Sequence, residues 1–553
     1  GNRITCRDWF QLCLKEGLTV FRDQQFSADM RSAPVQRIED VLALRGRQFR
    51  EDAGPLAHPV RPESFIEINN FYTATVYEKG AEIIGMLRRL VGADTYARAL
   101  DLYFDRHDGQ ACTIEDWLKV FEDVSGRDLS QFALWYSQAG TPRLSMDETW
   151  DDGRYTLTFR QTVPDTPGQR GKAPMVVPIA VGLLSPDGDE VVPTTVLEMT
   201  EAQQSFTFDG LSARPVPSIL RGFSAPVLLT RRVAAAEQRF LLAHDTDPFT
   251  RWEAGRSLAR GALTAMLTDG AAPDTGFIAA LETLLADETQ DPAFRALALR
   301  LPGQDDLAQA LSDAGAVPDP VAIHDALRDM ERALADHAET TLAALYNRHM
   351  VTGPYRPTAE DAGHRALANG ALALLSHLDG GTRAEAQFAA ADNMTQQLAA
   401  LTALVRLGGG AGALAQFHTQ WQHERLVIDK WFALQSSLAL PHTAVATARD
   451  LAQHPDFDWK NPNRFRALFG GLAGNAAGFH DPTGAGYDLL ADWLIRLDGA
   501  NPQTAARMAS AFETWRRYDA DRQQMMRAAL SRIASAPGLS RDLSEMVGRI
   551  LGH

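Results

Sequence analysis

The spacing of apolar residues changes twice along the chain and divides it into three segments. In residues 1–140 the apolar positions recur at the helical period, which predicts amphipathic helices. In residues 141–232 they alternate with polar positions, which predicts a small antiparallel β-sandwich. In residues 233–553 alanine- and leucine-rich segments follow one another with short Gly and Pro breaks, which predicts a large α-helical superhelix. The predicted fold class is therefore multidomain and mainly α, with one β-sandwich.

Two Thr-x-x-Asp spacings predict helix starts in the first segment. Thr5 and Asp8 come just before the apolar run that begins at Trp9, and Thr113 and Asp116 open a second run. In a capping box of this spacing, the hydroxyl and the acid each accept a backbone N–H at the start of the helix. We therefore expect both pairs to cap helices.

An acid stands on the apolar face of the first predicted helix. Trp9, Leu12 and Cys13 form a stripe at helical spacing, and the next position on this stripe is Glu16, followed at once by Gly17. A buried carboxylate is costly unless an arginine, a proton or a metal ion satisfies it. The pattern alone favours a structural carboxylate that pairs with an arginine or reaches water, and it leaves a metal ligand as the alternative.

The stretch EINNFYTATVYEKGAEI, residues 67–83, places many polar groups at the start of a predicted helix. It contains Asn69, Asn70, two tyrosines and Glu78. Tyr77 falls on the apolar stripe of that helix, and a buried phenol needs a hydrogen-bond partner. A backbone carbonyl is the simplest partner, and a functional role for the hydroxyl is the alternative.

Composition narrows the classes of function. The chain has 553 residues, 45% of them hydrophobic, and a net charge of −16. This charge argues against nucleic acid or an anionic membrane as a partner, and no apolar run reaches the roughly 18–20 residues of a membrane span. Three cysteines form no disulfide framework, which favours a reducing, cytoplasmic location.

Familiar catalytic and phosphate-binding motifs are absent from the sequence. It contains neither H-E-x-x-H nor G-x-x-x-x-G-K-[ST]. The glycine cluster RLGGGAGAL follows a predicted helix rather than a strand, which favours a connection between helices. His418 and His423 are five residues apart, a spacing that does not place both imidazoles on one helical face, so we predict no metal pair there.

Six segments of the chain, in order, are GNRITCRDWFQLCLKEGLTVFRDQQF, EINNFYTATVYEKGAEI, YFDRHDGQACTIEDW, WYSQAGTP, HDTDPFTRWEA and NPNRFRAL. Together they resemble the aminopeptidase N family, the gluzincin zinc aminopeptidases, in its bacterial type. The resemblance implies that residues 1–140 are the C-terminal part of a thermolysin-like catalytic domain. It implies that residues 141–232 are the β-sandwich that follows and that residues 233–553 are the superhelical domain.

The resemblance assigns roles to two residues. In the family, one zinc ion is bound by the two histidines of H-E-x-x-H and by a later glutamate, and Glu16, in the context KEGL, stands at the position of that glutamate. By the family spacing, both histidines and the glutamate that acts as general base would precede Gly1. The tyrosine of TVYEKG, here Tyr77, donates its hydroxyl in the family to the oxyanion that forms during hydrolysis.

Four further residues are weaker candidates for substrate binding. The resemblance implies that Tyr72 and Glu78 line the pocket. Arg466 and Arg507 stand where the family tends to present basic groups to the far end of the peptide. An ordinary salt-bridged helix surface is an equally good interpretation of these two arginines.

The sequence therefore predicts a portion of a zinc metallo-aminopeptidase, a hydrolase that removes N-terminal residues from peptides. We expect peptide substrates, a missing N-terminal half as partner, no nucleic acid, no membrane, a monomer, and one zinc ion in the complete enzyme. The chain alone lacks the two histidine ligands and the general base, so we expect it to be inactive. The alternative is a non-enzymatic α-solenoid and β-sandwich module that binds a protein partner.

Overall fold

The structure is a computed structural model that describes residues 2–54, 57–64 and 72–552. Asn69 and Asn70 lie outside the described residues. The chain divides into two compact units. Unit 1 comprises Gly1–Gly255, Asp287–Leu297 and Thr358–Glu360, and unit 2 comprises Arg256–Ala286, Ala298–Pro357 and Asp361–His553. In the described part of the chain, no helix combines the length and apolar character needed to cross a membrane.

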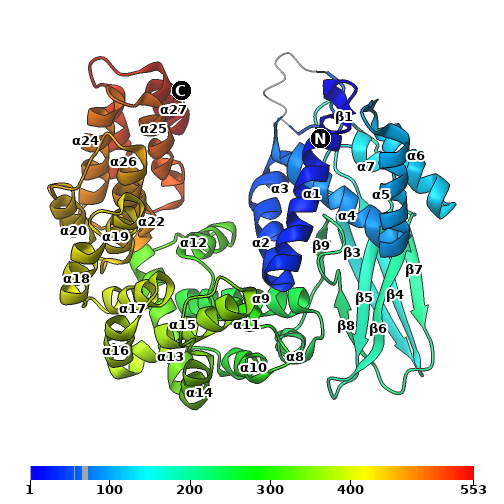
Figure 1. Cartoon of the computed structure of the whole chain (residues 1–553), viewed down its shortest axis with the longest axis horizontal. Coiled ribbons are helices and arrows are strands. Elements are labelled where there is room, and N and C mark those ends of the chain that lie inside the picture. Colours follow the sequence, from blue (N-terminus) through cyan, green and yellow to red (C-terminus); the bar gives the residue numbers. More distant parts are fainter. Residues whose placement is uncertain (1, 55–56, 65–71, 553) are drawn as a thin grey trace. The chain divides into compact units, whose positions relative to one another are not determined.

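Unit 1 contains a group of helices and a β-sandwich (Figure 1). Its helices are α1 (Leu12–Met30), α2 (Ala33–Ala43), α3 (Phe49–Asp52), α4 (Gly80–Val91), α5 (Ala93–His107), α6 (Ile114–Ser125), α7 (Leu134–Ser137), α8 (Ala235–His244) and most of α11 (Pro292–Ala298). Two single turns of π-helix, Leu44–Gln48 and Thr75–Lys79, precede α3 and α4. The helix α9 (Pro248–Asp269) begins in unit 1 and continues into unit 2.

The predicted helix starts are half right. Thr113 and Asp116 form a complete capping box at the start of α6. The prediction for Thr5 is wrong, because Thr5 lies in the short strand β1 (Thr5–Cys6), which pairs in parallel with β2 (Ala111–Cys112). Asp8 instead caps a 3-10 turn directly, accepting the backbone N–H of Phe10 at 3.0 Å. Thr5, which the spacing alone assigned to a helix cap, instead pairs with Ala111 in a two-stranded sheet.

The predicted stripe on α1 is also shifted by this start. Leu12 and Cys13 are buried, but Trp9 is 46% exposed because it lies in the 3-10 turn before α1. The stripe predicted on α4 is buried at Ile84 and Leu87. All three cysteines are free, in agreement with the absence of a disulfide framework.

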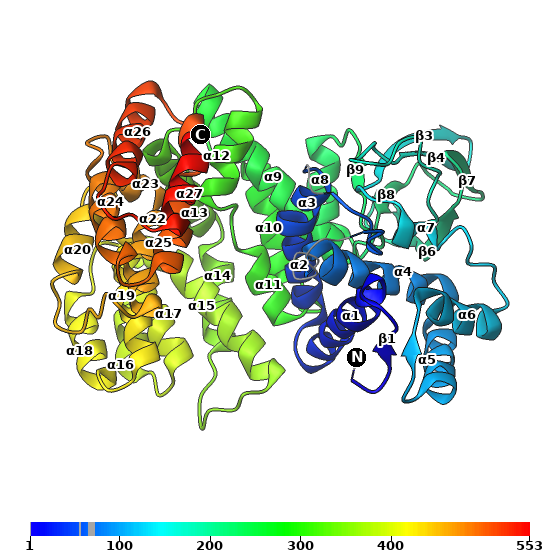
Figure 2. The ribbon, with the colours of Figure 1, turned by 90° about the horizontal axis from the view of Figure 1, so that it is seen from above.

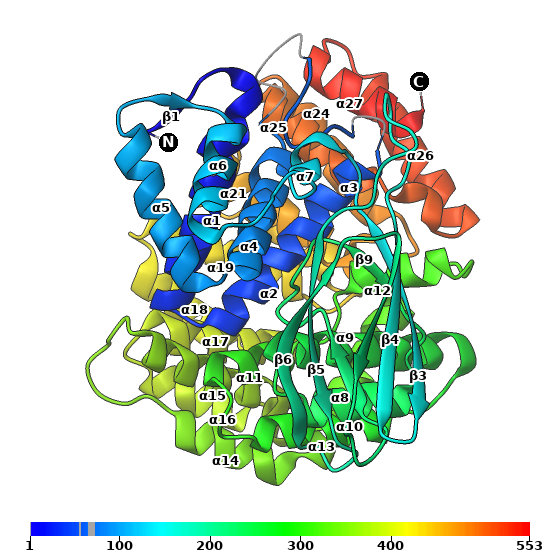
Figure 3. The same cartoon turned by 90° about the vertical axis from the view of Figure 1, so that its right-hand side faces the viewer.

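The β-sandwich consists of two sheets (Figure 3). Its strands are β3 (Arg143–Asp151), β4 (Arg154–Thr162), β5 (Val177–Leu184), β6 (Glu190–Met199), β7 (Gln203–Phe208), β8 (Val216–Ile219) and β9 (Leu228–Thr230). One sheet has the order β7-β4-β3-β9 and the other β6-β5-β8. The pairing is antiparallel except between β3 and β9, which run parallel.

Burial along the strands follows their position in the sandwich. On β4, Tyr155, Leu157 and Phe159 are fully buried, as the period-two pattern predicts. Every residue of β5 is buried, since this strand is central in its sheet and α4 contacts it as well. A strand covered on both faces has no need for alternation.

Unit 2 is helical throughout its described part, and its helices follow one another in chain order (Figures 1 and 2). They are α10 (Thr275–Ala286), α12 (Gln304–Asp313), α13 (Pro320–His337), α14 (Glu339–His349), α15 (Ala359–Asp379), α16 (Thr382–Ala390), α17 (Met394–Arg406), α18 (Ala411–Trp421), α19 (Arg425–Leu438), α20 (Ala444–Leu451), α21 (Pro462–Phe465), α22 (Gly471–Gly474), α23 (Ala476–Phe479), α24 (Ala485–Asp498), α25 (Pro502–Ala509), α26 (Ala520–Ala534) and α27 (Arg541–Leu551).

One apolar core runs through the second half of unit 2, from α15 to α27. The alanine- and leucine-rich segments of residues 233–553 include α10, α17, α24 and α26, each with apolar positions buried. Gly410, in the cluster RLGGGAGAL, has φ +79° and joins α17 to α18, so the cluster is a connection between helices. The predicted fold class, mainly α with a β-sandwich and a large helical domain, is confirmed.

Candidate active site

Glu16 is brought to its neighbours by a close approach of two backbones. Gly17, the next residue on α1, lies against Gly80 at the start of α4, and a Cβ added to Gly17 would stand 2.9 Å from the carbonyl carbon of Gly80. Only glycine permits this distance. The glycine that follows Glu16 is therefore what allows α1 to pack directly against the Thr75–Lys79 turn.

The carboxylate of Glu16 and the phenol of Tyr77 meet at this contact. The Glu16 side chain is 12% exposed, and Lys15 lies 3.1 Å from it. Burial and a hydrogen bond to Glu16 raise the pKa of Tyr77 to about 12. The phenol is therefore protonated at neutral pH and able to donate a hydrogen bond. Glu16 is thus paired with a lysine and a tyrosine, and its predicted role as a metal ligand stays a prediction.

Tyr72 belongs to the same group of side chains. Its ring is 6.3 Å from that of Tyr77, measured between centroids, and the Lys15 ammonium lies 5.8 Å from the centre of the Tyr72 ring. Tyr72 is 41% exposed, so it presents an aromatic surface to solvent beside the partly buried Glu16–Tyr77 contact. Such a surface could pack against the apolar side chain of a ligand.

Glu78 is directed to a different partner. Arg47 donates to it at 3.0 Å, and its other carboxylate oxygen is buried without a hydrogen bond. Burial raises the pKa of Glu78, while Arg47 opposes the shift. The predicted role of Glu78 in the pocket stays a prediction.

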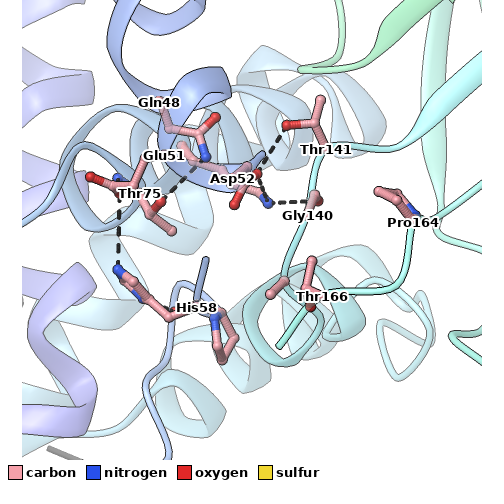
Figure 4. Close-up of polar contacts among 12 residues, drawn as sticks. Gln48, Glu51, Asp52, His58, Thr75, Gly140, Thr141, Pro164 and Thr166 are labelled. Atoms are coloured by element: carbon pink, nitrogen blue, oxygen red, sulfur yellow. Dashed lines mark hydrogen bonds and ion pairs between the residues drawn. The ribbon is translucent and has the colours of Figure 1, made fainter. Parts of the chain in front are cut away.

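A buried ion pair holds the turn that carries Tyr77. The ammonium of Lys79 donates to Asp52 at 2.8 Å and to the carbonyl of Gly140 at 3.0 Å. The side chains of Lys79 and Asp52 are each only 1% exposed. The Thr141 hydroxyl donates to the same carboxylate at 3.0 Å, as Figure 4 shows.

The other end of the turn is also fixed by hydrogen bonds (Figure 4). The Glu51 carboxylate accepts the backbone N–H of Thr75 at 2.8 Å, and the Gln48 amide donates to the Thr75 hydroxyl at 3.3 Å. His58 contacts the Thr73 hydroxyl at 3.0 Å. Tyr77 therefore sits in a π-helical turn clamped at both ends, and single π-helical turns are frequent at functional sites.

The clamp formed by Lys79 and Asp52 could not be predicted from local spacing. Lys79 and Asp52 are separated by 27 residues, and each belongs to a residue type that is almost always exposed.

The donor set near Glu16 does not complete a zinc site. A catalytic zinc ion takes three protein ligands and a water. In the described residues, the one group of three or more His, Cys, Asp or Glu donors close enough to share an ion is His418, His454 and Asp456. Glu16 fits a single ligand position, and the residues present cannot hold zinc there on their own.

Arg466 and Arg507 lie in unit 2 and are exposed. Arg466 bonds within its own turn, to the carbonyl of Pro462 and the side chain of Asn463. The role predicted for these arginines in contacting peptide stays a prediction.

The class of protein follows from a fold that combines a group of helices, a β-sandwich and a large helical domain. The family model described as "Domain of unknown function (DUF3458_C) ARM repeats" matches residues 235–552, and the chain belongs to this family. A model with the description "Ig-like fold" (DUF3458) matches residues 140–232, and the "Peptidase family M1 domain" matches residues 1–136.

Curated relatives specify the resemblance further. Aminopeptidase N of Caulobacter vibrioides is 47% identical over 563 residues, covering 100% of this chain and 64% of the relative. Aminopeptidase N of Escherichia coli is 41% identical over 576 residues, covering 100% of this chain and 65% of the relative. The chain thus spans about two thirds of the length of these relatives. The predicted resemblance to the aminopeptidase N family is confirmed.

A solved structure shares the fold along nearly the whole chain. Legionella pneumophila aminopeptidase A, crystallised in complex with aspartic acid, matches with a TM-score of 0.78 and 29% identity, over 99% of this chain and 64% of that one. The match covers the helical remnant, the sandwich and the helical domain alike.

Proposed function

We propose that this chain is part of a zinc aminopeptidase that removes N-terminal residues from peptides. The observation that carries the proposal is the contact of Glu16 with Tyr77 at the Gly17–Gly80 approach, in a segment that matches the peptidase M1 domain. The names of the relatives, aminopeptidase N, support this activity. We assign the proposed domains to residues 1–140, 141–232 and 233–553, as the sequence periods divide them.

In this proposal Glu16 is one zinc ligand, and the other ligands and the general base come from residues outside the chain. Zinc bound there would supply a Lewis acid and a water of lowered pKa. Glu16 contributes a negative charge held in place by Lys15 and the α1 backbone. Residues 1–553 alone are then unable to cleave peptides, because one carboxylate binds zinc too weakly.

Tyr77 acts in the proposal as a hydrogen-bond donor. Its raised pKa keeps the proton on the phenol at neutral pH, and the clamped turn keeps the hydroxyl directed toward Glu16. A donor preorganised in this way stabilises an oxyanion near the metal and commonly contributes about 10²–10³ in rate. Tyr72 would pack against the substrate, and Glu78, Arg466 and Arg507 would contact peptide. We also propose a monomer with a cytoplasmic location.

The test is a chimera in which the upstream third of Caulobacter vibrioides aminopeptidase N precedes Gly1. Release of the first residue from a short peptide is followed with and without a zinc chelator. We expect chelator-sensitive release that Glu16→Ala abolishes. A folded, zinc-loaded chimera that releases nothing would contradict the proposal and favour a non-enzymatic module of α-solenoid and β-sandwich, in which Glu16→Ala changes only stability.

A further inference from the structure

Two histidines and an aspartate converge on the surface of unit 2. His418 lies on α18, and His454 and Asp456 lie in the turn after α20. One ligand atom from each residue can be chosen so that all three lie within 4.8 Å of one another. Nε2 of His418 is 2.6 Å from Oδ2 of Asp456, and Nδ1 of His454 is 3.8 Å from the same oxygen.

These separations suit a shared metal ion. Bonds of about 2.0–2.2 Å from a tetrahedral zinc ion to nitrogen and oxygen put neighbouring ligand atoms about 3.3–3.6 Å apart. The observed separations of 2.6 and 3.8 Å lie on either side of that range. Side-chain shifts of less than about 1 Å would bring these two separations into that range.

The two imidazoles rest on a buried aromatic surface that limits their rotation. The Trp431 ring on α19 is 4.9 Å from that of His418 and 5.2 Å from that of His454. Trp431 is itself fixed, because its indole N–H donates to the carbonyl of Leu414 at 3.0 Å. Phe432, fully buried, meets His454 edge-on. The ligands are therefore held near a binding geometry before any ion arrives.

The turn that carries Asp456 is fixed as well. The Arg464 guanidinium donates to the backbone carbonyl of Asp456 and pairs with the carboxylate of Asp429. The positive charge beside the cluster is thus balanced by an acid outside it. The carboxylate of Asp456 remains directed at the histidines.

His454 presents a lone pair to the cluster. The backbone N–H of Asp456 donates to its Nδ1 at 3.2 Å, so this nitrogen carries no proton and can coordinate an ion in place of that long hydrogen bond. The side chains of His418, His454 and Asp456 are 22%, 28% and 41% exposed. Solvent can therefore reach the ion and complete its coordination.

We propose that His418, His454 and Asp456 bind one divalent transition-metal ion. Two imidazoles and a carboxylate are donors that suit Zn²⁺ and Co²⁺, and three protein ligands leave positions for water. The ion joins α18 to the turn after α20 and so stabilises this part of unit 2. The site is independent of Glu16, which lies in unit 1.

The test uses the whole chain after removal of metal by a chelator. Co²⁺ is titrated against its visible absorption, and Zn²⁺ competition follows. We expect one Co²⁺ per chain, with affinity lowered more than about 10-fold by each of His418→Gln, His454→Gln and Asp456→Asn. His423→Gln, at an exposed histidine five residues after His418, is the matched control and leaves the affinity unchanged.

Two results would overturn the proposal. One is a wild-type chain that binds no equivalent of Co²⁺, as expected if the residues form only a hydrogen-bonded pair of His418 with Asp456. The other is binding that the three variants leave as strong as the control does. Crystals of the wild type grown with Zn²⁺ decide the matter even if a variant misfolds: anomalous scattering at the zinc edge should peak between the three side chains, and its absence there contradicts the site.

Discussion

A buried charged pair in unit 1 contrasts with a buried neutral histidine in unit 2. In unit 1, Lys79 and Asp52 are buried as a charged pair with additional hydrogen bonds. In unit 2, His480 is buried, and its Nδ1 lies 2.8 Å from the Tyr487 hydroxyl. Burial, followed by the charges of Arg517 and Arg522, lowers its pKa to about 3. The ion pair of Lys79 and Asp52 holds a turn of unit 1 in place, whereas the buried imidazole of His480 in unit 2 stays neutral.

The difference bears on function. The ion pair of Lys79 with Asp52 anchors the end of the turn that carries Tyr77. The geometry of this pair therefore decides where the Tyr77 hydroxyl, a candidate catalytic group, lies. A charged pair of this kind gives little net stability relative to apolar residues, but the loss of one partner is severe. The comparison therefore predicts that single substitutions act more strongly in the unit 1 clamp than at the neutral histidine.

The largest expected effect is the loss of Lys79. Lys79→Met leaves the Asp52 charge buried without its cation, and we expect unit 1 to lose about 3–5 kcal/mol of unfolding free energy. Urea unfolding followed by circular dichroism measures it. Adding Asp52→Leu should restore a large part of the loss, whereas Lys119→Met, at an exposed lysine, should change little. Equal effects of the two lysine substitutions would contradict the clamp.

Gly17→Ala should cause the next largest loss of stability. Its Cβ would meet the backbone of Gly80 at 2.9 Å, so α1 must move away from the Tyr77 turn, at about 1–3 kcal/mol. The matched control is Gly46→Ala, also in a helical turn but with nothing within 4 Å of the added Cβ. Thermal unfolding of both variants tests this, and a Gly17→Ala chain as stable as the control would rule out the close approach.

His480 should make unit 2 sensitive to acid. Its pKa is about 3 when folded and about 6.5 when unfolded, so only the unfolded chain takes up a proton between these values. The unfolding free energy is therefore unaffected by protonation of His480 above pH 6.5. It falls as the pH drops toward 3, and the loss is about 2 kcal/mol at pH 5. His480→Gln should flatten this dependence, measured by urea unfolding from pH 7 to 5, and exposed His423→Gln should not. An unchanged slope in His480→Gln would contradict the neutral histidine.

Asp52 titrates in a lower window. Burial raises its pKa, but Lys79 and its hydrogen bonds outweigh burial and lower the pKa overall. Its contribution is therefore present above the unfolded value of about 3.9 and is lost only as the pH falls below it. Acid should weaken unit 2 through His480 before it weakens unit 1 through Asp52.

The smallest expected effect separates two similar sequence motifs. Thr113→Ala removes a cap from α6 and should cost about 1 kcal/mol. Thr5→Ala, at an exposed strand residue, should stay within about 0.5 kcal/mol. Urea unfolding of the two variants under one set of conditions compares the two losses of unfolding free energy. A larger loss for Thr5→Ala than for Thr113→Ala would mean that Thr5 acts as a helix cap after all.

The sequence predicted the elements whose cause is local. The period of apolar residues predicts α4, β4 and the helices of unit 2, because each buries one continuous face. The Thr5 prediction failed because a strand 105 residues away, β2, competes for that backbone. Capping spacing describes a residue and its near neighbours only.

The site was predictable only in part for the same reason. Glu16 was conspicuous because an acid breaks an apolar stripe, and the structure places it against Tyr77. The clamp at Lys79 and Asp52 and the cluster at His418, His454 and Asp456 join residues far apart in sequence. The spacing of His418 and His423 predicted no metal pair, whereas the partners of His418 lie after the next two helices.

The measurement that tests the central claim most directly compares zinc content with turnover in the chimera. It is made in a His454→Gln background so that an ion in unit 2 does not enter the count. We expect Glu16→Ala to lose both zinc and turnover. Tyr77→Phe should keep one zinc per chain and lower kcat by about 10²–10³. A Tyr77→Phe chimera with full turnover, or a Glu16→Ala chimera that keeps its zinc and activity, would contradict the account.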